Sequence, residues 1–278
     1  MNIFTLDFGY GPEVCLGKGK TIYQFVDREK RPKDTIDLIR NYGSYLEQDL
    51  AEIPRKYSYC PPILPQQMFL PARNFRSHSE ESGTQPPENP YFFMKTQNAL
   101  VPHHGNAILP RGVTRLDYEG EIGIIIGKHG KYIRPEDAGD YIFGYTVLDD
   151  VSIRDYQTQS QKGYGMDWVL GKNGDGCLPI GPHIVPKEDA PEFRFTIETF
   201  VNEKMKQHGS TDDMIFSPEQ LIARLSQTIT LREGDLISTG TPAGVAEYSS
   251  KEYLKPGDNI EISVKGIGTL KHSIVADQ

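Results

Sequence analysis

The stretch RLDYEGEIGIIIGK, from Arg115 to Lys128, decides the fold class of this chain. Its second half, rich in isoleucine and glycine, is typical of a buried β-strand. Side chains two residues apart on a strand point to the same face, about 6.5–7 Å apart, so Glu119 and Glu121 face the same way. The opposite face carries Tyr118, Ile122, Ile124 and Ile126. The chain therefore places two carboxylates at the edge of its own core.

Four further segments are rich in β-branched and aromatic side chains, with glycine and proline between them. They are residues 141–149, 193–202, 228–239 and 259–270. One helix is expected in FSPEQLIARLSQ, residues 216–227, where Ser217 caps the start, Pro218 takes the first turn and Gln220 completes a capping box. Because strands and helices do not alternate regularly, the pattern predicts a β-rich α+β fold rather than a doubly wound sheet.

The first part of the chain has a different character. A helix is expected from Asp34 to Leu50, where apolar residues recur at helical spacing and Asp34 or Thr35 can cap the start. The proline-rich stretch Cys60–Gln67 suits neither a helix nor a central strand. A boundary there predicts a small N-terminal α+β domain of residues 1–66 and a main domain of residues 67–278.

The composition excludes several classes of protein. The net charge is −8 and no basic run exists, so neither nucleic acid nor an anionic membrane is an expected partner. The longest apolar run is far too short to span a bilayer. Three scattered cysteines support neither a disulfide framework nor a cysteine zinc site. The N-terminus lacks the pattern of a secretory signal, and we expect a cytoplasmic protein.

The two glutamates conflict electrostatically if their strand is buried. Both cannot ionise on one buried face without a counter-charge, so one takes up a proton or a cation binds between them. Carboxylate oxygens are hard ligands that suit Mg²⁺, Mn²⁺ or Ca²⁺. The alternative is that both side chains lie at a solvated end of the sheet. A second acidic site favours the metal: Asp149 and Asp150 end another apolar strand, and only one of them can join the glutamates.

Five segments, in order, resemble the fumarylacetoacetate hydrolase family, in its smaller branch of acylpyruvate hydrolases and oxaloacetate decarboxylases. The resemblance runs from about Pro71 to the C-terminus. The segments are LDYEGEIGIIIGK (116–128), GYTVLDDVSIRDYQ (144–157), VNEKMKQHGSTDDMIFS (201–217), DLISTGTPAGV (235–245) and YLKPGDNIEISVKGIGTLKH (253–272). The resemblance implies a mixed β-sandwich or roll of that family's type, and a homodimer.

The resemblance also implies a metal site. The family's metal ligands correspond to Glu119, Glu121 and Asp150 in this sequence. Asp150 is chosen because it directly precedes VSIRD, and Asp149 stands where the family usually has asparagine. The expected ion is Mg²⁺, with Mn²⁺ or Ca²⁺ as substitutes.

The segment ARNFRSHSEES, residues 72–82, resembles the part of the family that carries a histidine and a glutamate three positions apart. This implies a His78–Glu81 pair, in which the carboxylate fixes the imidazole tautomer and raises its basicity, as a general base needs. Glu80 is adjacent and can be the partner instead. Similarly, DWVLGKNGDGCLPIGP, residues 167–182, implies that Lys172 lies near a developing oxyanion.

Substrate contacts are expected from two places. Arg73 and Arg76 lie near His78, and either can pair with a distal carboxylate; Arg76 is taken as the substrate-binding residue. The stretch Ser238–Val245 can cradle a carboxylate with its backbone N–H groups, around Gly240 and with help from the Thr241 hydroxyl.

The family's substrates are 2-oxo acids and 1,3-dicarbonyl compounds. The resemblance therefore implies an enzyme that uses a divalent metal to hydrolyse or decarboxylate a C–C bond of a short 2-oxo acid. An alternative is a hydratase, dehydratase or isomerase of catabolic 2-oxo acids, including deoxy-2-oxo sugar acids. A non-enzymatic alternative is a protein that binds a dicarboxylate through the metal.

Overall fold

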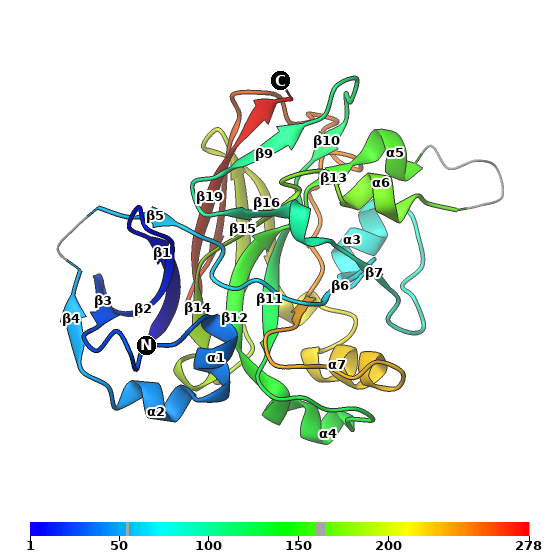
Figure 1. Ribbon diagram of the computed structural model, residues 1–278. Helices are drawn as coiled ribbons and strands as arrows, with labels where there is room; N and C mark the ends of the chain where they lie inside the picture. The colour runs from blue at the N-terminus through cyan, green and yellow to red at the C-terminus, as the bar shows by residue number, and fades with distance from the viewer. Residues whose placement is uncertain (54–55, 159–164, 278) are drawn as a thin grey trace.

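The computed structural model describes residues 1–53, 56–158 and 165–277, and its main elements are two sheets (Figure 1). The larger sheet is mixed. In spatial order its strands are β4 (Leu50–Glu52), β3 (Thr21–Phe25), β2 (Pro12–Lys18), β1 (Asn2–Asp7), β14 (Leu178–Pro186), β12 (Ile142–Asp149), β11 (Gly120–Ile126), β17 (Leu236–Ser238), β6 (Met68–Pro71) and β7 (Phe92–Met94), with β5 (Ser58–Tyr59) on β1 and β8 (Leu100–Pro102) on β14.

The second sheet packs across the middle of the first. Its spatial order is β16 (Lys204–Ser210), β15 (Thr196–Val201), β18 (Asn259–Val264), β19 (Gly268–Ala276) and β9 (Asn106–Leu109). A short separate ladder joins β10 (Leu116–Asp117) to β13 (Ser152–Ile153). This mixed, strand-rich architecture confirms the predicted fold class.

Short helices lie around the sheets (Figure 1). They are α1 (Thr35–Arg40), α2 (Tyr42–Leu46), α3 (Arg76–Glu81), α4 (Pro135–Ala138), α5 (Arg154–Thr158), α6 (Trp168–Lys172) and α7 (Pro218–Ser226), with 3₁₀ turns at 97–99, 139–141, 187–189 and 211–213. The capping box predicted for α7 is present: the Ser217 hydroxyl accepts from the Gln220 N–H, and the Gln220 side chain accepts from the Ser217 N–H.

The helix expected from Asp34 to Leu50 is wrong in its extent. Asp34 does cap the start, since its carboxylate accepts from the Asp37 N–H at 2.7 Å. The helix stops at Asn41, however, and a second short helix contains Gly43, which has low helix propensity. Leu50 belongs to β4 instead. The N-terminal strands join the large sheet through the pairing of β1 with β14, and the division at residue 66 stays a prediction.

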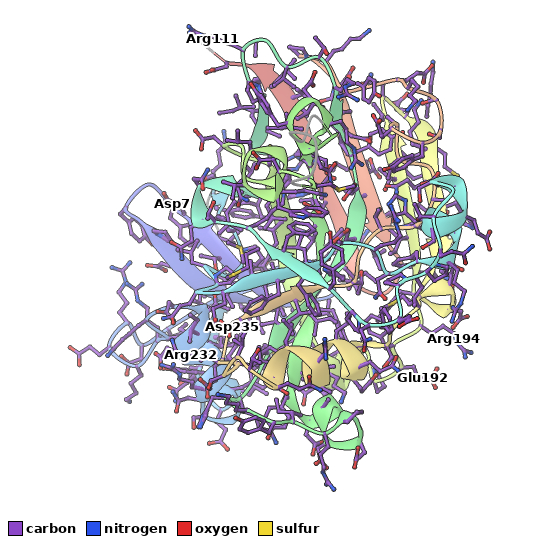
Figure 2. All side chains as sticks on the ribbon, turned by 90° about the vertical axis from the view of Figure 1, so that its right-hand side faces the viewer. Asp7, Arg111, Glu192, Arg194, Arg232 and Asp235 are labelled. Atoms are coloured by element: carbon purple, nitrogen blue, oxygen red, sulfur yellow. The ribbon has the colours of Figure 1, made fainter. Side chains whose placement is uncertain are left out.

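Strand β11 is buried on both faces. Ile122, Ile124 and Ile126 belong to the core between the two sheets, whereas Ile125 belongs to a second core on the other face, with Leu148 of β12. This alternation is the one that the sequence predicts. Side chains fill the space between the ribbons, while Arg111 and Arg194 lie at the periphery (Figure 2). Among the described residues, none of the helices has both the length and the apolar character that crossing a bilayer requires.

Gly120 lies between the two glutamates, and its missing side chain matters. A Cβ at this position would lie 2.2 Å from the Thr199 hydroxyl oxygen. We expect Gly120→Ala to lower the free energy of unfolding by about 1–3 kcal/mol, because the second sheet must shift to accept the methyl group. Gly43→Ala, in helix α2 with nothing within 4 Å, is the control and is expected to stabilise slightly. Urea unfolding of both variants checks this, and an undisturbed Gly120→Ala protein would contradict it.

Candidate active site

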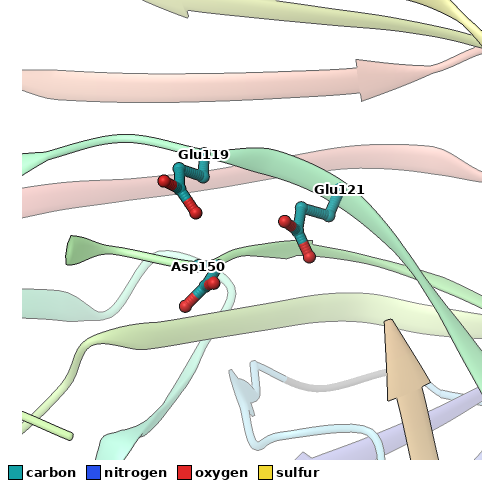
Figure 3. Close-up of side chains that lie close together, drawn as sticks. All are labelled: Glu119, Glu121 and Asp150. Carbon is teal, nitrogen blue, oxygen red and sulfur yellow. The ribbon is translucent and has the colours of Figure 1, made fainter. Parts of the chain in front are cut away.

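Three buried carboxylates converge where β11 and β12 run side by side (Figure 3). Glu121 belongs to β11, Glu119 directly precedes it, and Asp150 directly follows β12. One carboxylate oxygen from each lies within 4.8 Å of the others. The three residues are at most 5% exposed. An all-oxygen set of this kind has the chemistry that a hard divalent cation needs.

Three buried cations surround this cluster. The Lys172 ammonium, from the end of α6, lies 2.6 Å from both Glu119 Oε2 and Asp150 Oδ2. Arg154, at the start of α5, places Nη2 2.5 Å from Glu119 Oε1. Lys95, just after β7, places Nζ 2.7 Å from Asp150 Oδ1 and also donates to two backbone carbonyl oxygens. Each cation thus approaches a carboxylate of the cluster from a different element.

Glu121 is the exception. Its carboxylate accepts a hydrogen bond from the Ser238 hydroxyl, and within the described part of the chain it forms no ion pair. Burial raises its pKa well above the ordinary value, and the neighbouring Asp150 and Glu119 charges raise it further. Together with Asp117, which pairs with Arg154, the site holds four buried carboxylates against three buried cations. The charge that lacks compensation is on Glu121.

The cations act differently on the other two ligands. Burial opposes ionisation of Glu119, but Lys172 and Arg154 outweigh it and hold the pKa of Glu119 well below its ordinary value. Burial raises the pKa of Asp150, although Lys172 and Lys95 oppose the rise. Burial also works against the Lys172 charge, yet Asp150 and Glu119 raise the pKa of the ammonium. Glu119 and Lys172 are therefore ionised at neutral pH.

Asp149 points away from the cluster. Its Oδ1 accepts from the Glu119 N–H at 2.7 Å, and its Oδ2 lies 2.8 Å from His272 Nε2 on β19. Both residues are at most 2% exposed. The Asp149–His272 pair therefore ties the backbone of one cluster residue to the second sheet.

His78 and Glu81 meet on helix α3. His78 Nδ1 lies 2.8 Å from Glu81 Oε1, and Glu81 Oε2 accepts from the Gly244 N–H at 2.9 Å. Glu80 is exposed, so of the two candidates left open by the sequence it is Glu81 that contacts the imidazole. Asn74, just before the helix, donates a hydrogen bond to the Thr239 carbonyl at 2.9 Å, which ties α3 to the segment after β17. With Nδ1 held, Nε2 is the ring nitrogen left for proton transfer.

A pocket of about 130 Å³ connects these groups. Glu119, Arg154, Lys172 and His78 line it, so one carboxylate of the cluster and the histidine face the same cavity. Its remaining walls are Ala72, Arg73, Gln85, Pro87, Tyr91, Gln157, Met166, Trp168 and Tyr248.

The residues predicted to bind substrate lie elsewhere. Arg76 is exposed and donates from Nη1 to the Met214 carbonyl at 2.7 Å. The Thr241 hydroxyl donates to the Gly120 carbonyl and accepts from the Gln207 amide, at 2.9 and 2.8 Å. Gly240 and Thr241 are buried and are absent from the described pocket wall. The Thr241 side chain hence supports the backbone of β11 and does not line the cavity.

Sequence reasoning did not single out Lys95, Arg154 or Asp117. Lys95 ends the aromatic segment YFFMK, and a lysine there has no feature that separates it from a surface lysine. Arg154 and Asp117 both lie inside segments that carry the family resemblance, next to acidic residues. The position of these two charged residues next to acidic residues was the signal by which the sequence could have identified them.

Comparisons with known proteins assign the chain to a family. Residues 67–275 match the family described as fumarylacetoacetate (FAA) hydrolase, C-terminal. Together with the fold, this match defines the class of protein to which the chain belongs. The chain belongs to the fumarylacetoacetate hydrolase family.

Several relatives are similar over most of the chain. An oxaloacetate tautomerase of Bacillus subtilis is 36% identical over 270 residues, which is 94% of this chain and 85% of the relative. The fumarylacetoacetate hydrolase structure from Exiguobacterium antarcticum has a TM-score of 0.85 and 28% identity, with each chain covered completely. A fumarylpyruvate hydrolase of Pseudomonas aeruginosa, solved with Mn²⁺ and pyruvate, has a TM-score of 0.71 and 30% identity over 77% of this chain and 91% of its own.

Metal binding is expected to depend on pH through Glu121. Because the pKa of Glu121 is raised, a proton on Glu121 competes with a cation for the metal-free site. The Kd for Mn²⁺ should therefore fall as pH rises, and binding should release a proton. Calorimetry in buffers of different ionisation enthalpy measures both quantities. A Kd independent of pH between 5 and 9 would contradict this assignment, and Glu121→Gln should weaken binding and remove the proton release.

Substitutions of Asp149 test whether its hydrogen bonds or its charge support metal binding. Asp149→Asn retains an acceptor for the Glu119 N–H and a polar group for His272, so we expect the Kd for Mn²⁺ to stay nearly unchanged. Asp149→Leu removes both contacts and should raise that Kd by about 10–100-fold. Titration calorimetry on both folded variants decides this. Equal weakening by Asn and Leu would show that the charge of Asp149 matters instead.

Proposed function

We propose that this protein is a divalent-metal-dependent enzyme that cleaves a C–C bond in a 2-oxo acid, either by hydrolysis or by decarboxylation. The carrying observation is the cluster of Glu119, Glu121 and Asp150, whose Glu119 lines the same pocket as His78 of the His78–Glu81 pair. Mg²⁺ or Mn²⁺ is the proposed ion. Homodimer formation, implied by the family resemblance, and a cytoplasmic location, expected from the N-terminal sequence, remain part of the proposal; light scattering tests the first and cell fractionation the second.

Charge supports a metal together with an anionic substrate. With all four carboxylates ionised, the three cations leave one negative charge, and a divalent cation would turn this into one positive charge. A 2-oxo acid carries the negative charge that such a site attracts. When bound, the cation would supply Lewis-acid polarisation of the 2-oxo group.

His78 is the proposed general base. Glu81 holds Nδ1, so Nε2 can accept a proton from water or from the carbon next to the 2-oxo group. In hydrolysis, that water attacks the distal carbonyl carbon, the C3–C4 bond breaks, and the enolate that leaves takes up the proton held on His78. The ammonium of Lys172, which lines the pocket, would stabilise negative charge that develops on a substrate oxygen. Decarboxylation uses the same groups without attack by water.

A second candidate is proton transfer alone, as in a tautomerase or isomerase of 2-oxo acids. The observation that favours it is the 36% identity, over 94% of this chain, with the Bacillus subtilis oxaloacetate tautomerase. His78 would then remove a proton at one position and return it at another, with no bond cleavage between carbons.

Turnover of a small panel separates these candidates. We expect cleavage of acetylpyruvate, fumarylpyruvate or oxaloacetate in the presence of Mg²⁺ or Mn²⁺ and its loss on chelation, with a deoxy-2-oxo sugar acid included for the hydratase alternative. Product analysis distinguishes cleavage from enol–keto exchange. His78→Ala should lower kcat by about 10²–10⁴-fold, whereas a dicarboxylate-binding protein would have no turnover to lose.

Glu81→Gln and Glu80→Gln form a matched pair of controls. Glu81 contacts His78, whereas the exposed Glu80 side chain does not. We expect the first variant to lose activity and the second to retain it. Full activity after exhaustive chelation, or equal effects of the two variants, would refute the proposed chemistry.

A further inference from the structure

We infer that Asp117 is a positioning residue, which fixes His78 in place relative to the carboxylate cluster. This role rests on the proposed function, since it makes Asp117 the link between the base and the metal site of that proposal. Three observations support it: the hydrogen bonds that converge on the Asp117 carboxylate, the contacts of residues 243–248 with helix α3, and the ion pairs that Arg154 forms with both Asp117 and Glu119.

The first observation concerns the Asp117 carboxylate, which lies at the end of β10 and is completely buried. Oδ1 accepts from the N–H groups of Tyr118 and Ala246, at 2.9 and 2.8 Å. Oδ2 accepts from the Glu247 N–H and from Arg154 Nε, each at 2.9 Å. All of these partners are donors, and the two oxygens of a carboxylate can accept from all of them at once. Asp117 therefore joins its own strand to the start of α5 and to the segment that comes after β17.

The second observation concerns that segment, residues 243–248, which we call the clamp segment. The Gly244 N–H donates to Glu81 Oε2 at 2.9 Å. The Tyr248 ring packs edge-on against the His78 ring, with 5.8 Å between the ring centres. Because Glu81 also contacts His78 Nδ1, the clamp segment controls both the partner of the imidazole and the orientation of its ring.

Tyr118 gives the clamp segment a second attachment. Its side chain is completely buried, and its hydroxyl donates to the Gly244 carbonyl at 3.1 Å. Asp117 and Tyr118 therefore bind the clamp segment from adjacent positions, and the residue that follows them is Glu119 of the cluster. Three consecutive residues thus connect the cluster to the clamp segment.

The third observation concerns Arg154, which lies between Asp117 and the cluster. Its Nη2 lies 2.9 Å from Asp117 Oδ2 and 2.5 Å from Glu119 Oε1. Arg154, Glu119 and His78 line the same pocket. A chain of direct contacts thus runs from the cluster through Arg154, Asp117 and the clamp segment to the histidine. Loss of the Asp117 carboxylate would release the clamp segment and remove one of the carboxylates that pair with Arg154.

The first test observes the imidazole directly and needs no substrate. In metal-free protein with isotopically labelled histidine, nitrogen NMR should show His78 as one fixed tautomer, and the spectrum of His78→Ala identifies its signals. Asp117→Asn keeps the size of the side chain but places a donor where one of the oxygens accepts. We expect its His78 signals to move toward those of a histidine that exchanges between both tautomers. Tyr248→Ala should have the same effect, whereas Tyr248→Phe, which retains the ring contact, should leave the signals in place.

Asp235→Asn is the matched control. Asp235 is also a completely buried aspartate, and its Oδ2 accepts from the Arg232 N–H and from the Gln67 side chain, both at 2.8 Å. These partners lie outside the clamp segment. The variant should lower the melting temperature without moving the His78 signals. A shift as large as that in Asp117→Asn would be a general effect of losing a buried carboxylate and would overturn the inference.

A substrate from the panel adds a kinetic test. At saturating Mn²⁺ and substrate, Asp117→Asn should lower kcat by about 10–100-fold. In the His78→Ala background the same substitution should have no further effect, because Asp117 acts through His78. Equal losses in both backgrounds would mean that Asp117 supports the fold rather than the base.

The outcomes separate the two proposals. If the metal-loaded protein turns over no substrate of the panel, the proposed function fails, and the NMR comparison still decides the role of Asp117. Unchanged His78 signals in folded Asp117→Asn would overturn the inference and leave the proposed function standing. Melting temperatures establish which variants are folded.

Hydrogen exchange in the wild-type protein decides the matter if Asp117→Asn does not fold. The amides of Ala246 and Glu247 lie outside helices and strands, so the Asp117 carboxylate is the group that should protect them. Exchange of both amides at the rate of an unstructured chain would overturn the inference.

Discussion

Two carboxylates on one buried face of a strand cannot both ionise unless positive charge reaches the same face. Glu119 and Glu121 impose this condition on the whole domain. The chain meets part of it with Lys95, Arg154 and Lys172, which come from three separate elements and each contact the cluster. These cations sit on two short helices and just after a strand. The electrostatics of the site therefore require α5, α6 and β7 to lie close to β11. A divalent cation would neutralise the negative charge that these three side chains leave uncompensated.

The same elements also build the cavity. Helix α6 carries Lys172 to the carboxylates and, one turn earlier, Trp168 to the pocket wall. Helix α3 carries His78, and Asn74 next to it is bonded to the backbone of the segment that follows β17. The charged groups and the walls that exclude water are therefore fixed by shared elements. A change that displaces one of these helices alters the electrostatics and the shape of the pocket together.

Local pattern was sufficient for the fold class. The alternation in β11, the capping box of α7 and the absence of regular strand–helix alternation are properties of neighbouring residues, and the structure has all three. The helix expected from Asp34 to Leu50 is wrong in its extent because that prediction relied on apolar spacing and gave no weight to Gly43. Side-chain parity put Glu119 and Glu121 on one face, but only the family resemblance selected Asp150 over Asp149. The role of Lys95 could not be predicted from the sequence, because its burial depends on contacts between segments distant in sequence.

The location of the site follows from where the ladder of β11 stops on one side. Strand β17 pairs only with Gly123 to Ile125. Beyond that point side chains complete the backbone hydrogen bonds of β11: the Gly120 N–H donates to Gln207 Oε1 and the Ile122 N–H donates to Thr239 Oγ1. A continued strand would satisfy the same groups but would place its own side chains next to Glu119 and Glu121, on the face that they share. Replacing a strand by side chains keeps the backbone satisfied and leaves room for a pocket beside the carboxylates.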